Sequence, residues 1–225
     1  LVRLLMKSFR ILSVIPYIDC KYGGPPYVAQ SLHYCFKKIG LTSTVLTLSD
    51  SKMAKDVISF KGLSYCYFFS VDFLLNCFSY INNSDVVIIH GVYSFPSFWT
   101  TVVSFIFRKK IILLPHGMLD KDSVFSSCLI KNCLRFVYIH TVFRVQFLFI
   151  NKIIFNSKKE YVNSYFSKRS RIIPNGIDSS ILNHCYEKKR VNMPLRLLFL
   201  GRLHPIKGIE LILKALSRFC DTSSF

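Results

Sequence analysis

Acidic residues are scarce in this chain of 225 residues, which has 12 Asp and Glu against 30 Lys and Arg. With so few carboxylates, the chain has no carboxylate pair at glycosidase spacing and no carboxylates or thiols at metal-ligand spacing near its histidines. No two of the eight cysteines form a C-x-x-C pair, and their spacings are irregular. This pattern predicts free, mostly buried thiols in a reducing cytoplasm.

Long apolar runs without polar interruptions are also missing. The segment 136–155 is long enough to span a bilayer, but five polar side chains interrupt it: His140, Arg144, Gln146, Asn151 and Lys152. A buried or interfacial helix that runs into a strand is therefore favoured over a membrane span. The apolar stretch 9–15 is short and has no small-residue cleavage site, which indicates a first strand and not a signal peptide.

The positive charge is abundant and concentrated. The formal net charge is +18, and the region from Lys131 to Arg171 holds nine Lys or Arg and one acid, Glu160. A solvated basic face, an anionic membrane surface and an anionic substrate each explain such a region. Nucleic acid is the remaining candidate, but no zinc finger, RRM signature or helix-turn-helix is recognisable, so no nucleic-acid partner is expected.

Strand-like and helix-like patterns alternate along the chain. The expected strands are 9–15, 44–48, 64–70, 85–90, 110–114, 153–155 and 171–174. The expected helices are 26–39, 71–81, 95–107, 123–150 and 157–166, the last with a capping box of Ser157 and Glu160. This alternation predicts an α/β fold with a Rossmann-like, doubly wound, mostly parallel sheet.

A second unit of the same kind begins near the C-terminus. An apolar strand over 195–200 precedes a basic glycine loop and a helix from Ile209, while 178–194 is polar and linker-like. The predicted organisation is an N-terminal Rossmann-like domain over 1–174, a linker over 175–194, and the first β-loop-α of a second Rossmann-like domain over 195–225. Because this second domain is incomplete and the chain begins at Leu1, we expect a fragment or a truncated protein.

Glycines and histidines follow the predicted strands. Ligands of open α/β sheets bind at the carboxyl ends of strands, so these pairs predict a polar crevice. The pairs are Gly23-Gly24, His90-Gly91, His116-Gly117, Asn175-Gly176 and Gly201-Arg202. Taken singly, the double glycine is either an ordinary tight turn, which is the favoured interpretation, or an anion site at a helix start, and each histidine is structural or catalytic. Arg202 and Lys207 suit a diphosphate, although a solvated basic turn has the same composition.

Six segments together resemble one family. They are GGPPYVAQSL, VVIIHGVYSF, LLPHGMLD, IIFNSKKE, RIIPNGID and FLGRLHPIKGIELILKAL, in that order. Their order and spacing resemble those of the retaining glycosyltransferases of family four (glycosyl transferases group 1), over nearly the whole chain. The resemblance implies the GT-B architecture, in which two Rossmann-like domains face a cleft, and makes 1–174 the acceptor-side domain.

The resemblance also implies roles for particular residues. His116 lies near the transferred sugar and His90 on the acceptor side, which makes both candidate catalytic residues. The candidate donor-binding residues are Gly23, Gly24, Asn175, Gly176, Arg202 and Lys207. The family's donor site also uses a Glu-x7-Glu segment further along the second domain, and the given sequence stops before such a segment. We therefore expect the chain to be inactive alone.

The implied reaction is transfer of a hexose-type sugar from a nucleotide-sugar donor to a saccharide or lipid-linked acceptor. It proceeds with retention and without a metal or cofactor, and the leaving phosphate helps to deprotonate the acceptor. Surface polysaccharide biosynthesis at the cytoplasmic face of the cell membrane is the implied setting, with the basic region 131–171 against anionic lipid. The alternatives are an inactive remnant, a basic membrane- or nucleic-acid-binding module, and a GT-B relative acting on a phosphosugar.

Overall fold

The computed structural model describes residues 9–19, 22–48, 55–62, 67–124, 129–176, 197–201, 203 and 207–222. The chain divides into two units, Leu1–Gly176 and Ile177–Phe225. We call them the sheet unit and the C-terminal unit and describe each by itself. The candidate site is built on the sheet unit.

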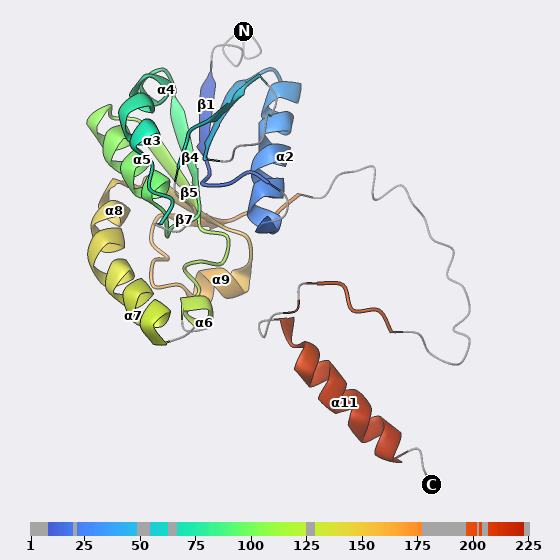
Figure 1. The fold of residues 1–225 in the computed structure, drawn as a ribbon. Coiled ribbons are helices and arrows are strands. Elements are labelled where there is room, and N and C mark those ends of the chain that lie inside the picture. The colour runs from blue at the N-terminus through green and yellow to red at the C-terminus, as the bar shows by residue number, and fades with distance from the viewer. Residues whose placement is uncertain are drawn as a thin grey trace. The chain divides into compact units, whose positions relative to one another are not determined.

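The sheet unit is organised around seven parallel strands in the order β3-β2-β1-β4-β5-β6-β7 (Figure 1). The strands are β1 (Arg10–Val14), β2 (Thr42–Thr47), β3 (Val57–Ser59), β4 (Val86–His90), β5 (Lys110–Leu114), β6 (Lys152–Phe155) and β7 (Ser170–Ile172). A parallel sheet with crossover helices is the Rossmann-like α/β fold that the alternating sequence pattern predicts, and the prediction is confirmed.

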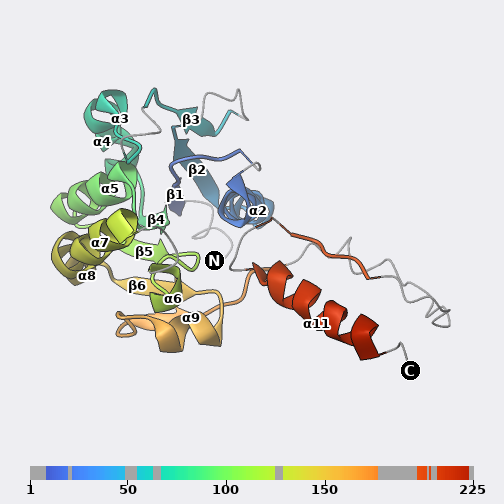
Figure 2. The ribbon, with the colours of Figure 1, turned by 60° about the horizontal axis from the view of Figure 1, so that its bottom comes forward.

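Helices cover both faces of the sheet. Helix α2 (Gly24–Lys38) lies on one face, and α3 (Val71–Asn76), α4 (Phe78–Asn82), α5 (Phe95–Ile106) and α8 (Arg144–Phe149) lie on the other (Figure 2). The remaining described helices of this unit are α6 (Lys121–Val124), α7 (Leu129–Tyr138), the π-helix η2 (Ile139–Phe143) and α9 (Lys158–Asn163). Because both faces are covered, the central strands are apolar almost throughout.

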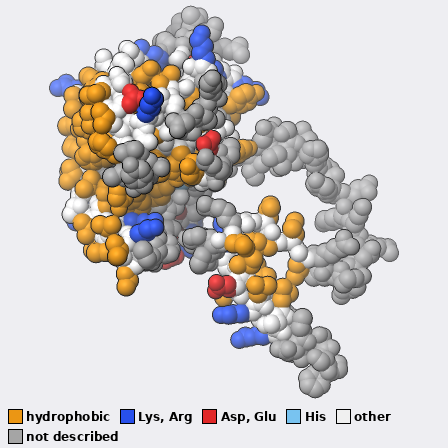
Figure 3. Space-filling model, in the orientation of Figure 1, with side chains coloured by type: hydrophobic (Ala, Val, Ile, Leu, Met, Phe, Trp, Pro, Cys, Tyr) orange, Lys and Arg blue, Asp and Glu red, His pale blue; other side chains and the backbone are white. Residues whose placement is uncertain are grey.

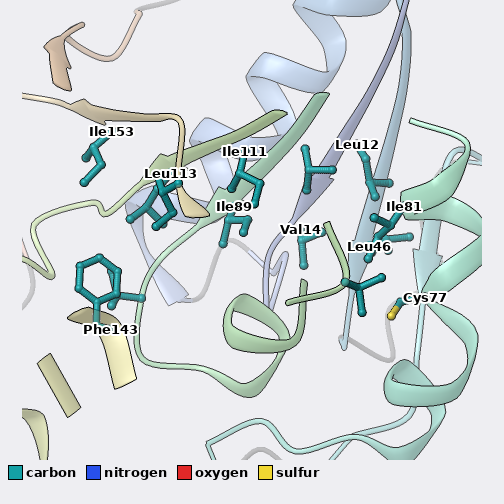
Figure 4. Close-up of a cluster of buried hydrophobic side chains, with 14 of the residues drawn as sticks. Leu12, Val14, Leu46, Cys77, Ile81, Ile89, Ile111, Leu113, Phe143 and Ile153 are labelled. Atoms are coloured by element: carbon teal, nitrogen blue, oxygen red, sulfur yellow. The ribbon is translucent and has the colours of Figure 1, made fainter. Parts of the chain in front are cut away.

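The core follows the alternation of side chains along each strand. Leu12 and Val14 of β1 point into the larger cluster on the α5 side, whereas Ile11 joins the smaller cluster on the α2 side. Figure 4 shows part of the larger cluster, which extends from Leu46 across the strands to Phe143. Each such side chain contributes roughly 1.5–3 kcal/mol through burial, so this packing supports the strand ends that carry the site.

The third predicted strand is wrong in position. We expected 64–70, but the strand beside β2 is β3, where Val57 pairs with Val45. Of the expected segment, 64–66 lies outside the described residues, and Tyr67 and Phe68 adopt φ of 48° and 59°. Residues with this left-handed backbone conformation cannot continue a β ladder, so the chain turns here before α3.

One of the two long predicted helices is divided, whereas the other region is largely helical as expected, with α7, η2 and α8 running without a break from Leu129 to Phe149. The expected helix over 71–81 divides at Cys77 into α3 and α4, and the expected helical region 123–150 contains α6, α7, η2 and α8. None of the helices in the described ranges combines the length and the apolar content that crossing a bilayer requires. Cys77 is buried, but Cys35 and Cys133 are exposed on their helices, so the expectation of mostly buried thiols does not hold for these two.

The C-terminal unit contains the predicted helix, α11 (Ile209–Thr222). The described part of the expected strand, 197–200, does not form a strand, and the side chains of Leu198 and Leu200 are 89% and 92% exposed. A parallel strand is stabilised only by neighbouring strands, and the described residues of this unit provide none. The apolar pattern of 195–200 was therefore not sufficient to predict a strand there.

Candidate functional site

The strand order reverses between β1 and β4, since β1 pairs with β2 on one side and with β4 on the other. In doubly wound sheets the crevice at such a reversal, outside the carboxyl ends of the strands, is where ligands bind. The loops that follow β1 and β4 carry two of the predicted motifs, Gly23-Gly24 and His90-Gly91. The candidate site is therefore this edge of the sheet.

Gly23 and Gly24 form the start of α2, with Gly23 as the N-cap and Gly24 as the first helical residue. No side chain caps this end, and no acidic residue lies in its first turn. Pro25 and Pro26 follow, and because proline has no N–H, they remove two of the amides that a helix start normally offers to an anion. The anion-binding capacity of this end is therefore smaller than the double glycine alone suggested.

His90 is the last residue of β4 and is 1% exposed. Gly91 then turns the chain with a φ of 86°, and a Cβ at this position would lie 3.2 Å from Cε of Met118. Met118 also lies 3.3 Å from the backbone N–H of Val92 through its sulfur. The glycine is thus favoured by the backbone conformation, and a larger residue would also require a small shift of the Met118 side chain.

His116 occupies a tight turn after β5. The N–H of Met118 donates to the carbonyl of Pro115 at 3.0 Å, and the two central residues, His116 and Gly117, have φ of 52° and 83°. Positive φ at both central positions is the pattern of a type I′ turn. A histidine is uncommon in this conformation and carries strain of order 1 kcal/mol, which the contacts described next offset.

The structure brings the two histidines into direct contact. Nδ1 of His90 lies 3.0 Å from Nε2 of His116, and the two ring planes differ by 11°. The pairing arises because β4 and β5 are neighbours and His90 is in register with Leu114, two residues before His116. Motif spacing placed both residues at strand ends, but only the pairing of strands shows that they share a hydrogen bond.

Both imidazoles are neutral at neutral pH. Burial, and secondarily the neighbouring His116, lowers the pKa of His90 from 6.5 to about 3. Burial lowers the pKa of His116 from 6.5 to about 4. A neutral imidazole carries one N–H donor and one acceptor nitrogen, so this pair can bind hydroxyl groups but supplies no positive charge.

Two residues of the site were not predicted as functional. Asn156 directly follows β6, and its Nδ2 lies 3.4 Å from Nδ1 of His116. Glu160 of α9 accepts the N–H of Gly117 at 2.6 Å through Oε1 and the N–H of Asn156 at 3.2 Å through Oε2. A polar residue immediately after a buried strand was the available signal for Asn156, and it matches the signal that identified the histidines.

The capping box expected at Ser157 and Glu160 is only half formed. The Ser157 hydroxyl accepts the N–H of Glu160 at 3.2 Å, as in the motif. The Glu160 carboxylate instead bonds to Asn156 and to Gly117. Burial raises the pKa of Glu160, although its two backbone hydrogen bonds oppose this rise. Glu160 thus joins the loop after β6 to the turn that carries His116.

The remaining predicted residues lie elsewhere. Asn175 and Gly176 follow β7 at the carboxyl edge and are exposed. Lys207 is exposed just before α11 in the C-terminal unit, and Arg202 lies outside the described residues. The assignment of Arg202 and Lys207 to the donor diphosphate, and of Asn175 and Gly176 to donor binding, stays a prediction. Within the described ranges, no three His, Cys, Asp or Glu side chains are grouped as a metal site.

The comparisons with known proteins concern the fold. No protein-family model matches the chain, and no curated protein matches its sequence. A crystal structure of Anabaena HepE in complex with UDP is similar, with a TM-score of 0.56 and 13% identity over 77% of this chain. The S. aureus MnaA–UDP structure has a TM-score of 0.45 and 11% identity, over 73% of this chain and 44% of MnaA. The chain spans 46% of the HepE chain, so the likeness shows a shared fold over less than half of that protein.

Proposed function

We propose that the sheet unit is the acceptor-side half of a nucleotide-sugar-dependent glycosyltransferase that transfers a hexose-type sugar with retention. The observation that carries the proposal is the hydrogen-bonded pair of His90 and His116 at the carboxyl edge of a Rossmann-like sheet. The fold shared with a UDP-bound structure and the six segments resembling family four support it.

The histidine pair suits a sugar better than a phosphate. Both imidazoles are neutral because burial lowers their pKa values, and one of them, His90, is almost entirely buried. A neutral, desolvated N–H binds an uncharged hydroxyl oxygen without leaving a charge unbalanced, whereas a diphosphate needs cations. In this proposal the histidines contact sugar hydroxyls.

The leaving diphosphate then requires positive charge from elsewhere. Arg202 and Lys207 in the C-terminal unit are the proposed source, with Asn175 and Gly176 opening the connection to that unit and Gly23 and Gly24 near the reacting sugar. Positive groups aimed at the oxygen where charge develops stabilise the transition state. No metal or cofactor takes part in this proposal.

The carboxylate that bonds to the turn of His116 supports a reaction without a protein nucleophile. Both oxygens of this group, Glu160, accept backbone N–H groups. A covalent glycosyl-enzyme needs a free carboxylate close to the sugar. We therefore assign removal of the acceptor proton to the departing phosphate, which leaves on the face that the acceptor attacks.

The proposed acceptor is a saccharide, free or lipid-linked, of surface polysaccharide assembly. Hydrophobic side chains gather over the side of the sheet unit formed by α5, α7 and α8 (Figure 3). The exposed apolar side chains of α7 and α8 are Leu129, Ile130, Leu134, Phe136, Val137, Val145 and Leu148. Lys131, Arg135 and Arg144 lie among them, a combination that suits the anionic inner leaflet of a membrane.

Saturation-transfer NMR on the purified chain tests the proposal with a panel of nucleotide-sugars and saccharides. We expect saccharides to bind and His116→Asn to weaken their binding about tenfold, or ~1.4 kcal/mol. Asparagine tolerates the positive φ of this turn, so the variant removes the imidazole with little backbone strain. His140→Asn, at an exposed position of η2, is the matched control and should leave binding unchanged. Failure of the whole panel to bind would refute the proposal.

A further inference from the structure

Three side chains from three successive strand ends form a chain of hydrogen bonds. Nδ2 of Asn156 lies 3.4 Å from Nδ1 of His116, and Nε2 of His116 lies 3.0 Å from Nδ1 of His90. The far nitrogen of His90, Nε2, is buried and has no hydrogen-bond partner among the described residues. The chain of bonds therefore ends on an unsatisfied ring nitrogen at the candidate site.

The direction of these bonds follows from what each group is able to do. An amide nitrogen only donates, so Nδ1 of His116 accepts from Asn156. A neutral imidazole has one N–H, which for His116 is then on Nε2 and donates to Nδ1 of His90. By the same rule the N–H of His90 is on Nε2. Both rings are thus Nε2–H tautomers, and the unsatisfied nitrogen of His90 is a donor.

We propose that Asn156 is a positioning residue, which fixes His116 and His90 as Nε2–H tautomers and thereby makes His90 present a buried N–H donor to an uncharged oxygen of the bound ligand. A buried N–H without a partner costs free energy, and a ligand hydroxyl that accepts it removes this cost. Identification of that oxygen as a sugar hydroxyl rests on the proposed function, whereas the tautomer assignment does not.

Glu160 supports Asn156 in this role. Its Oε2 accepts the backbone N–H of Asn156, and its Oε1 accepts the backbone N–H of Gly117, the residue after His116. One carboxylate therefore holds the backbones of both hydrogen-bonding partners. This arrangement keeps the amide of Asn156 opposite Nδ1 of His116 even though Asn156 lies in a loop.

The experiment is long-range ¹H–¹⁵N correlation NMR of the chain labelled with ¹⁵N-histidine, which identifies the protonated nitrogen of each ring. At about pH 8, above the ordinary imidazole pKa of ~6.5, we expect Nε2–H for both His90 and His116. His140 provides an internal reference for the other tautomer, Nδ1–H, because its Nδ1 donates to the Phe136 carbonyl at 2.9 Å. His90→Gln and His116→Asn assign the signals.

The decisive variant is Asn156→Asp. A carboxylate only accepts, so Nδ1 of His116 should become protonated and the His116 signal should switch tautomer or become that of an imidazolium. Asn83→Asp introduces the same charge at an exposed position and should leave both rings unchanged. A wild-type spectrum with Nδ1–H on His116, or an Asn156→Asp variant with unchanged tautomers, overturns the proposal. The wild-type spectrum decides the question even if the variant does not fold.

The ligand part is tested by adding the saccharide panel to the same labelled sample. We expect the Nε2–H signal of His90 to shift on binding, and Asn156→Leu, which removes the amide donor, to abolish that shift. If saccharides bind in the saturation-transfer experiment but none moves this signal while both rings remain Nε2–H, the ligand contact of His90 is overturned and the tautomer assignment stands. Failure of the whole panel to bind refutes the proposed function instead, so the two proposals fail separately.

Discussion

The sheet unit and the C-terminal unit differ in what becomes of similar apolar sequence. In the sheet unit, Leu46 is fully buried and Phe143 is 1% exposed, whereas in the C-terminal unit Leu198 and Leu211 are 89% and 71% exposed. Both units were predicted as strand–loop–helix patterns of the same type. The difference shows that the pattern specifies which residues can be buried, while burial itself depends on neighbouring strands.

Amide exchange should show the largest difference between the two units. We expect amides of β4 and β5 to open only with global unfolding, at about 5 kcal/mol or more. Helix α11 has 14 residues and mostly exposed apolar side chains, and an isolated helix of that length is marginal in water. Its amides should therefore exchange close to the unprotected rate. Equal protection of α11 and β4 would show that the C-terminal unit is packed in solution.

Leucine-to-alanine substitutions sharpen the same comparison. Leu46→Ala creates a cavity in the main cluster and should reduce the free energy of unfolding by about 3–5 kcal/mol. Leu211→Ala, on α11, should change the stability of the sheet unit by less than about 0.5 kcal/mol. Urea unfolding followed by fluorescence of Trp99, the single tryptophan and part of α5, measures both. A loss at Leu211 similar to that at Leu46 would contradict the separation of the units.

The histidine pair should make the sheet unit sensitive to acid. The folded pKa values of His90 and His116 lie below the ordinary 6.5, so the unfolded chain binds more protons as the pH falls. The contribution of the two neutral histidines to the free energy of unfolding is fully present above pH 6.5. It is lost as the pH falls towards about 4 for His116 and about 3 for His90. The free energy of unfolding then falls by up to about 1.4 kcal/mol per pH unit for each proton taken up on unfolding.

Variants separate this effect from that of Glu160. The raised pKa of Glu160 acts in the opposite direction, because its contribution is present below 4.5 and is lost as the pH rises through its folded pKa. His116→Asn should make the acid limb shallower in urea unfolding between pH 6.5 and 4, and His140→Asn should leave it unchanged. An unaltered acid limb in His116→Asn would argue against a buried neutral His116.

Membrane binding should show the smallest effects per residue. Each cation near an anionic leaflet contributes about 1 kcal/mol, so Lys131→Glu or Arg144→Glu should weaken binding to phosphatidylserine vesicles several-fold. Arg135→Glu also removes a contact with the Tyr93 ring, so the test depends on the other two. Lys214→Glu on α11 is the control in the C-terminal unit. Equal co-sedimentation with neutral and anionic vesicles would exclude the electrostatic contribution.

Local patterns predicted most elements because they depend on near neighbours in sequence. Strand β5 has the predicted bounds, and β1, β4 and α5 differ by one residue at one or both ends. The errors arose where contacts distant in sequence decide the outcome. Residues 57–59 form a strand because they pair with β2. The Glu160 side chain accepts the N–H of Gly117, 43 residues away, and not an N–H of its own helix.

By itself, the sequence determined the alternation of apolar strands and helices, and it placed a double glycine before α2 and a histidine at the ends of β4 and β5. These features are local, because side-chain periodicity and backbone freedom depend on adjacent residues. Only the tertiary structure decided that β4, β5 and β6 lie next to one another, so that His90, His116 and Asn156 form one hydrogen-bonded chain. Hydrogen bonds need atoms within about 3.5 Å, and strand order alone brings residues 26 and 40 positions apart to that distance.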